Sequence, residues 1–129
     1  MEFTLECLLP ASPEQVYDMW LNSDGHSSMT GSEANCSAEL GASFNAWDGY
    51  IWGKNKELEP KARIVQSWRT SEFDDANPDS EVEILFKNEE GETRLILHHR
   101  NLQEGDTQYI TGWKEHYFVP MLEYLSPNF

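Results

Sequence analysis

The feature that most constrains this chain is a succession of short β-strand patterns between residues 33 and 101. Turn-forming residues separate these patterns, and every connection is short, so neighbouring strands are expected to run antiparallel. The pair Asp48-Gly49 predicts a two-residue hairpin turn of type I′, because both residues tolerate positive φ angles. Strands are predicted at residues 34–38, 43–47, 52–58, 62–70, 81–87 and 93–101.

The two ends of the chain add a further strand and the helices. Residues 2–9 alternate polar and apolar side chains, which predicts a strand with one buried face. The run Ser12-Pro13-Glu14-Gln15 predicts a capped helix start, and the irregular stretch that follows this helix has room for a second helical turn. After Gly105 the apolar period becomes 3.6, which predicts one helix over residues 106–125 that Pro120 bends rather than ends. The fold class is therefore α+β.

Charged residues fix which side chains of the strands face inward, because an unpaired buried charge costs more than an exposed apolar group. The charged residues placed outward are Lys54, Lys56, Arg63, Arg69, Glu81, Glu83, Lys87, Arg94 and Arg100. The adjacent His98 and His99 therefore point to opposite faces and cannot bind one ion together. The predicted inner face comprises Ile51, Gly53, Asn55, Glu57, Ile64, Gln66, Trp68, Val82, Ile84, Phe86, Leu95, Leu97 and His99.

Four polar residues on this predicted inner face, Asn55, Glu57, Gln66 and His99, are more than an ordinary core satisfies. A wet internal cavity would explain them. Alternatively, they lie near strand ends, or a β-bulge resets the alternation, and both explanations stay open at this point. Glu57 is the weakest member of the set, because it is close to the turn at Pro60.

Composition limits the function classes. Nine Lys and Arg against 23 Asp and Glu give a net charge of -14, which repels nucleic acid and anionic membranes. The chain contains neither a signal-peptide pattern nor an apolar run of about 18 residues, so a cytoplasmic protein is expected. Cys7 and Cys36 fit no metal or redox spacing, and we expect reduced thiols with no metal and no cofactor. The 129 residues suit a single domain spanning 1–129.

Five stretches carry a family resemblance that spans almost the whole chain. They read ASPEQVY at 11–17, FNAWDGYIWGKN at 44–55, RIVQSWR at 63–69, GETRL at 91–95 and GWKEHYF at 112–118. In these stretches the chain resembles the bacterial relatives of the activator of heat-shock protein 90 ATPase, within the START-like (SRPBCC) superfamily.

The resemblance implies a helix-grip fold, in which a strand, two short helices and a curved antiparallel sheet hold the long last helix, often with a cavity between sheet and helix. It implies a chaperone partner and a place in the stress response. It covers the part that resembles the C-terminal half of the eukaryotic co-chaperone, so the separate N-terminal chaperone-binding domain is expected to be absent. Ala42 departs from the family pattern, in which a second glycine often follows Gly41.

The first functional hypothesis is non-enzymatic binding of a small hydrophobic or amphipathic ligand between the last helix and the sheet. Each aromatic residue taken alone is better explained as an ordinary core position, and only the combination favours a cavity. The predicted ligand-binding residues are Asn55, Gln66, Trp68, Phe86, Leu97, His99, Trp113 and Tyr117.

The second hypothesis is a co-chaperone-like protein interaction through the outer face of the sheet. A basic band there would attract an acidic partner, unless the band pairs with Glu81 and Glu83 across the sheet. The band consists of Lys54, Lys56, Arg63 and Arg69. A monomer or a weak homodimer is expected.

The third hypothesis is an enzyme, a cyclase or hydrolase with His99 as base beside Glu57 or Tyr117. The sequence contains no nucleophile elbow, metal cluster or phosphate loop that supports it. Binding is therefore favoured over catalysis, and no catalytic residue is assigned.

Overall fold

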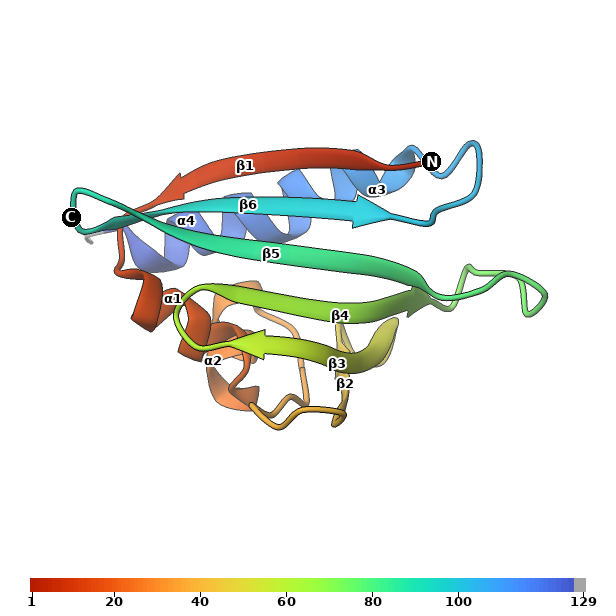
Figure 1. The fold of residues 1–129 in the computed structure, drawn as a ribbon, viewed down its shortest axis with the longest axis horizontal. Coiled ribbons are helices and arrows are strands. Elements are labelled where there is room, and N and C mark those ends of the chain that lie inside the picture. The colour runs from red at the N-terminus through yellow and green to blue at the C-terminus, as the bar shows by residue number, and fades with distance from the viewer. Residues whose placement is uncertain (127–129) are drawn as a thin grey trace.

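One antiparallel β-sheet forms the frame of the protein in the computed structural model, which describes residues 1–126. Its six strands lie in the order β1-β6-β5-β4-β3-β2, so the first and last strands of the chain are neighbours (Figure 1). This arrangement confirms the predicted antiparallel pairing. The strands are β1 (Phe3–Leu9), β2 (Ser43–Ala46), β3 (Ile51–Glu59), β4 (Arg63–Thr70), β5 (Ser80–Glu89) and β6 (Glu92–Arg100).

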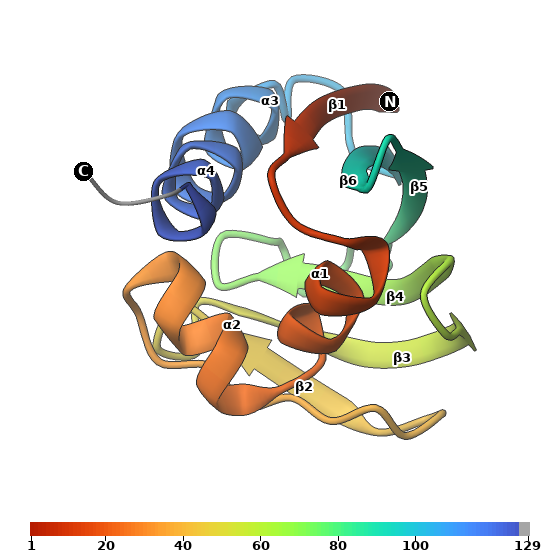
Figure 2. The same ribbon diagram turned by 90° about the vertical axis from the view of Figure 1, so that its left-hand side faces the viewer.

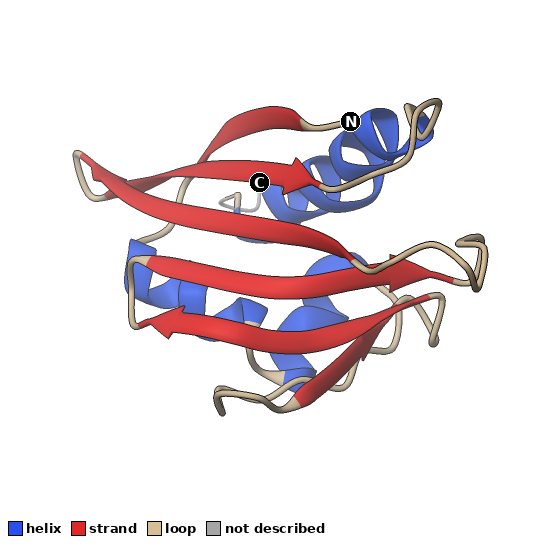
Figure 3. Cartoon of the chain, turned by 45° about the vertical axis from the view of Figure 1, so that its right-hand side comes forward, coloured by secondary structure: helices blue, strands red, loops and turns tan. Residues whose placement is uncertain are grey.

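The helices lie on the concave side of the sheet, as Figures 2 and 3 show. The α+β class and the predicted helix-grip fold are thus confirmed. Within residues 1–126, no helix combines the length and the apolar character needed to cross a membrane. The helical segments are α1 (Pro13–Trp20), α2 (Ser23–Thr30), α3 (Gln108–Trp113), the π-helical η1 (Lys114–Phe118) and α4 (Val119–Leu125).

Local capping explains where the first two helices begin. The Ser12 hydroxyl accepts a hydrogen bond from the Gln15 backbone N–H at 3.2 Å, as the capping pattern predicts. The Asn22 side chain accepts in the same way from the Gly25 N–H at 2.9 Å. Because of this second cap, the stretch after α1 forms a complete helix rather than an isolated turn.

The strand predicted at residues 34–38 is wrong. Only Asn35 pairs there, in an isolated bridge to Asn45. The Ser23 hydroxyl bonds to both backbone polar groups of Cys36, at 2.9 Å to the N–H and 3.1 Å to the carbonyl. These bonds tie the segment to α2, and the Cys36 backbone is therefore not available to a β-ladder.

The hairpin between β2 and β3 is present, but its loop is longer than the predicted two residues. Ala46 pairs with Ile51, so the loop comprises residues 47–50. Trp47, Asp48 and Gly49 all adopt positive φ, at 55°, 55° and 90°. The left-handed conformation thus extends one residue further toward the N-terminus than Asp48-Gly49 alone indicates.

The C-terminal helix continues through Pro120, as predicted, but contains one π turn. The Val119 N–H bonds to the carbonyl of Lys114, five residues back, and Pro120 has no N–H to donate. All flanking residues keep right-handed helical angles. The helix therefore accommodates the proline by widening one turn.

The predicted inward and outward alternation is confirmed on β5 and β6, and on β4 except at Val65, which is buried although it lies on the outward side. Trp68, Phe86 and Leu97 are buried and Lys87 is exposed, whereas Arg69 and Arg94 are only half-buried. The inward placement of Glu57 is wrong, because a register shift between Asn55 and Glu57 turns Glu57 to the exposed face. A β-bulge thus resets the alternation at that residue, while Asn55, Gln66 and His99 remain buried.

Candidate functional site

His99 lies at the centre of the sheet–helix interface and has no exposed surface. Its Nδ1 accepts a hydrogen bond from Trp113 Nε1–H at 2.9 Å, which leaves the ring proton on Nε2. Nε2 donates to Ser80 Oγ at 2.9 Å, and that hydroxyl donates to the Trp68 carbonyl at 2.6 Å. Burial lowers the pKa of His99 to about 3. His99 is therefore a neutral imidazole with both nitrogens engaged within the protein.

A second buried histidine, His26 on α2, was not anticipated from the sequence. Its Nδ1 donates to the Trp20 carbonyl at 2.9 Å, and its Nε2 accepts from the Tyr117 hydroxyl at 2.8 Å. Burial lowers the pKa of His26 to about 4 and raises the pKa of Tyr117. The bond joins α2 to the π turn of the C-terminal helix. The one sequence signal that could have placed His26 on a helix was Asn22, which caps α2.

Asn55 and Gln66 form a separate polar pair on β3 and β4. Gln66 Nε2 donates to Asn55 Oδ1 at 2.9 Å. Asn55 Nδ2 donates to the carbonyls of Ser37 and Glu39, both at 2.9 Å. The pair therefore fastens the loop before β2 to the sheet, and no hydrogen bond joins it to His99 among the described residues.

Aromatic side chains fill the space between sheet and helix. Trp113 packs at a centroid distance of 4.8 Å from Tyr117 and 5.5 Å from Trp68, and Tyr117 stacks at 5.1 Å on Trp20. Within residues 1–126, the indole nitrogen of Trp47 is the only buried side-chain nitrogen or oxygen without a hydrogen-bond partner. The interior is therefore closely packed and almost fully satisfied.

A small cavity of about 50 Å³ remains beneath the C-terminal helix. Pockets that hold drug-sized ligands usually measure about 300–1,000 Å³, and one water molecule occupies about 30 Å³. The cavity as it stands is therefore too small for such a ligand. Its lining residues are Ile51, Trp68, Tyr109, Gly112, Trp113 and Tyr117.

The structure distributes the predicted ligand-binding residues over three places. Trp68, Trp113 and Tyr117 line the cavity, and His99 lies directly behind them through its bonds to Trp113 and Ser80. Asn55 and Gln66 form their own pair, and Phe86 packs at 5.5 Å on Tyr17 of α1 while Leu97 is fully buried. Sequence reasoning missed Ile51, Tyr109 and Gly112 as lining residues, because neighbours across three elements are not visible in a linear pattern.

The proposed pairing of His99 with Glu57 as an acid–base couple is wrong. Glu57 is exposed and bonds to Arg63 Nη1 at 2.7 Å on the outer face of the sheet, whereas His99 is fully buried on the inner face. The bulge that turns Glu57 outward is the physical reason.

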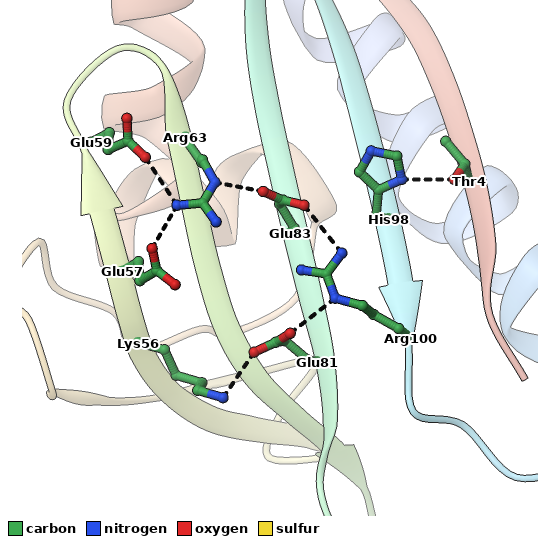
Figure 4. Close-up of polar contacts among 9 residues, drawn as sticks. All are labelled: Thr4, Lys56, Glu57, Glu59, Arg63, Glu81, Glu83, His98 and Arg100. Carbon is green, nitrogen blue, oxygen red and sulfur yellow. Dashed lines mark hydrogen bonds and ion pairs between the residues drawn. The ribbon is translucent and has the colours of Figure 1, made fainter.

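The outer face of the sheet carries a chain of ion pairs across β3, β4, β5 and β6 (Figure 4). Glu81 bonds to Lys56 at 2.8 Å and to Arg100 at 2.9 Å. Glu83 links Arg100, at 3.1 Å, to Arg63. The alternative in which the basic band pairs with Glu81 and Glu83 therefore holds for Lys56 and Arg63.

The other two members of the basic band differ from each other. Arg69 binds Asp79 at 2.7 Å, whereas Lys54 has no ion-pair partner within residues 1–126. Trp52, two residues before Lys54 on β3, keeps 40% of its surface exposed. An aromatic ring and an uncompensated cation thus lie side by side on the outer face.

Comparison with curated proteins identifies relatives named after chaperone activation. The chain is 25% identical over 118 residues to the human "Activator of 90 kDa heat shock protein ATPase homolog 1", which covers 91% of this chain but 35% of the human protein. It is 35% identical over 75 residues to the Dictyostelium discoideum "Activator of 90 kDa heat shock protein ATPase homolog", covering 58% and 19% of the two chains. The chain thus spans about a third or less of these relatives.

Solved structures share the fold. An HSP90 activator from Plasmodium falciparum superimposes with a TM-score of 0.80 at 21% identity, covering 92% of this chain and 91% of that one. An Aha1 dimer from Colwellia psychrerythraea gives 0.81 at 17% identity, covering 97% and 96%. At residues 10–125 the sequence matches the family described as "Activator of Hsp90 ATPase homolog 1-like protein", and the chain belongs to that family.

Proposed function

We propose that the chain is a co-chaperone-like interaction module that binds an HSP90-type chaperone through its surface. The observation that carries the proposal is the filled interior. The side chains of His99, Asn55 and Gln66 form hydrogen bonds within the protein. The cavity measures about 50 Å³. An interior with almost no spare polar groups offers little to orient a ligand, so recognition is expected at the surface. Family membership supports an HSP90-type partner.

The proposal treats residues 1–129 as one cytoplasmic domain that is a monomer or a weak homodimer. The ion pairs of the outer face join four neighbouring strands, which favours a stiff platform for a partner. A preformed surface loses little conformational freedom on binding, and this lowers the cost of association.

The direct test uses the purified chain and the HSP90-type chaperone of the same organism. Isothermal titration calorimetry measures binding, and steady-state ATP hydrolysis, corrected with an ATP-site inhibitor of the chaperone, measures stimulation. We expect saturable binding with a Kd below about 100 μM, the range of transient complexes. Absence of heat and of any change in hydrolysis at concentrations above that value would reject the proposal.

A second candidate function is the binding of a small apolar ligand, and the apolar lining of the cavity is the observation that favours it. Such a ligand would have to push the C-terminal helix away from the sheet, with Trp68, Trp113 and Tyr117 as its contacts. Native mass spectrometry of the protein purified from its own host tests this candidate. A reproducible additional mass that disappears on denaturation supports it, and the bare chain mass alone counts against it.

A further inference from the structure

Two open hollows on the outer face of the sheet meet at Lys54. One, of about 500 Å³, lies between β2 and β3 beside Asn45 and Trp52. The other, of about 560 Å³, extends toward β5 beside Lys56 and Glu81. Both are lined by Lys54, Ser67 and Asp79, so they form one continuous depression, which we name the Trp52–Lys54 groove.

The backbone explains why the sheet is hollowed at this point. The β3–β4 ladder pairs Trp52 with Arg69 and Asn55 with Gln66. Between these pairs, the Lys54 N–H donates to the Ser67 hydroxyl at 2.9 Å. A side chain at Gly53 would place its Cβ 1.8 Å from the Ser67 carbonyl oxygen, so only glycine permits this approach. Gly53 and Ser67 both line the hollow between β2 and β3, at the point where β3 and β4 approach closely.

The charges around the groove leave one cation uncompensated. The carboxylate of Asp79 is held by Arg69 at 2.7 Å, and that of Glu81 by Lys56 at 2.8 Å. Lys54 alone among these groups lacks an opposite charge in the described part of the chain. In a protein of net charge -14, such a position is a local site for a negative group.

Trp52 supplies the second contact. Aromatic residues, tryptophan above all, dominate the binding energy of protein interfaces, and Trp52 is 40% exposed at the edge of the groove. Trp52 and Lys54 are alternate residues of one strand, so their side chains project from the same face about 6.6 Å apart along the backbone. An extended peptide has the same repeat between alternate residues.

We propose that the Trp52–Lys54 groove binds an extended acidic segment of the chaperone partner, in which an apolar side chain packs on Trp52 and a carboxylate two residues away pairs with Lys54. This inference rests on the proposed function and names the surface that it uses. The expected motif is an apolar residue, any residue, then Asp or Glu, in a region of the chaperone without regular structure or at a strand edge.

The test compares three variants of the full chain against the purified chaperone by titration calorimetry. Lys54→Glu and Trp52→Ala change the groove. Lys87→Glu is the matched control, because Lys87 is an exposed lysine on the outer face of β5, outside both hollows. We expect Lys54→Glu and Trp52→Ala to raise the Kd for the chaperone by about tenfold or more. Lys87→Glu should change this Kd by less than about twofold. Melting temperatures of all three verify folding.

The outcomes separate the two proposals. If both groove variants bind like the wild type, the groove proposal is overturned while the proposed function stands. If the wild type does not bind the chaperone, the proposed function fails and the groove proposal fails with it. If analytical ultracentrifugation shows a wild-type dimer that Lys54→Glu dissociates, the occupant is a second copy of the chain, and the acidic-segment proposal is overturned.

Discussion

The inner and outer faces of the sheet both carry polar side chains, but they satisfy them differently. On the inner face, His99, Asn55 and Gln66 bond to neutral partners and are almost completely removed from water. On the outer face, Glu81 and Glu83 pair with cations and remain partly exposed. Buried neutral hydrogen bonds are costly to break, whereas exposed ion pairs contribute little each. Stability should therefore depend on the inner face, and recognition on the outer face.

Acid should produce the largest effect, and it acts through the inner face. In the folded protein the pKa values of His26 and His99 are lowered to about 4 and about 3, whereas unfolded histidine titrates near 6.5. Below pH 6.5 the unfolded chain therefore binds more protons, and stability falls by about 1.4 kcal/mol per pH unit for each histidine. By pH 5 the loss should reach roughly 4 kcal/mol.

Urea unfolding between pH 7.5 and pH 5 measures this loss. Ordinary carboxylates, with pKa values near 4, stay ionised across most of this interval, so the histidines dominate the signal. Equal unfolding free energies at pH 7.5 and pH 5 would show that neither ring is held neutral.

The two adjacent histidines of β6 offer the sharpest contrast between the faces. Replacement of His99 by leucine removes the partners of Trp113 Nε1–H and Ser80 Oγ inside the core, and we expect a loss of about 2–3 kcal/mol in unfolding free energy. Among residues 1–126, His98 bonds only to Thr4 on the outer face, so His98→Leu should cost less than about 0.5 kcal/mol. Chemical denaturation of both variants measures the two losses in unfolding free energy. Similar losses for His99→Leu and His98→Leu would contradict the contrast between the two faces.

Removing a charge from the outer face should lower the unfolding free energy less than removing His99 does. Glu83→Gln removes a link between Arg63 and Arg100, but Arg63 keeps Glu57 and Glu59, and Arg100 keeps Glu81. We therefore expect a loss of about 1 kcal/mol that shrinks at high salt. Glu123→Gln, on the exposed part of α4, serves as the control and should be neutral. A loss comparable to that of His99→Leu would mean that the ion pairs, too, form part of the core.

The smallest effect concerns the cavity. A Cβ at Gly112 would meet no atom within 4 Å, so Gly112→Ala should gain about 0.5–1 kcal/mol of stability from helix propensity. Gly31 also has open space but a φ of 81°, so Gly31→Ala should instead lose about 1 kcal/mol. Thermal unfolding measures both, and a destabilised Gly112→Ala would indicate that the cavity is tighter than the structure indicates.

Much of the fold was predictable because charges and glycines mark strands and turns directly. The placement of Arg63, Glu81 and Arg94 outward was sufficient to predict that Trp68, Phe86 and Leu97 are buried. The bulge after Asn55 was not predictable, since an extra residue in one strand leaves no mark in the pattern.

The polar contacts were harder to predict than the strands. His26 lies in a serine-rich helix with a weak apolar stripe, and its partner Tyr117 is 91 residues away in the chain. Asn55 bonds to the loop at Ser37 and Glu39, which was expected to be part of a strand and its turn. Such partners become visible only when the elements are packed together. The ligand-binding role of Asn55, Gln66 and His99 stays a prediction.

The most direct test of the central claim, that the interior polar groups hold the structure together, is the tautomer of the two buried histidines. Long-range ¹H–¹⁵N NMR of the ring nitrogens at pH 7 and pH 5 reports it. The bonds predict a neutral His99 with its proton on Nε2 and a neutral His26 with its proton on Nδ1, both unchanged at pH 5. Titration of either ring near pH 6.5, or a His99 proton on Nδ1, would contradict the account.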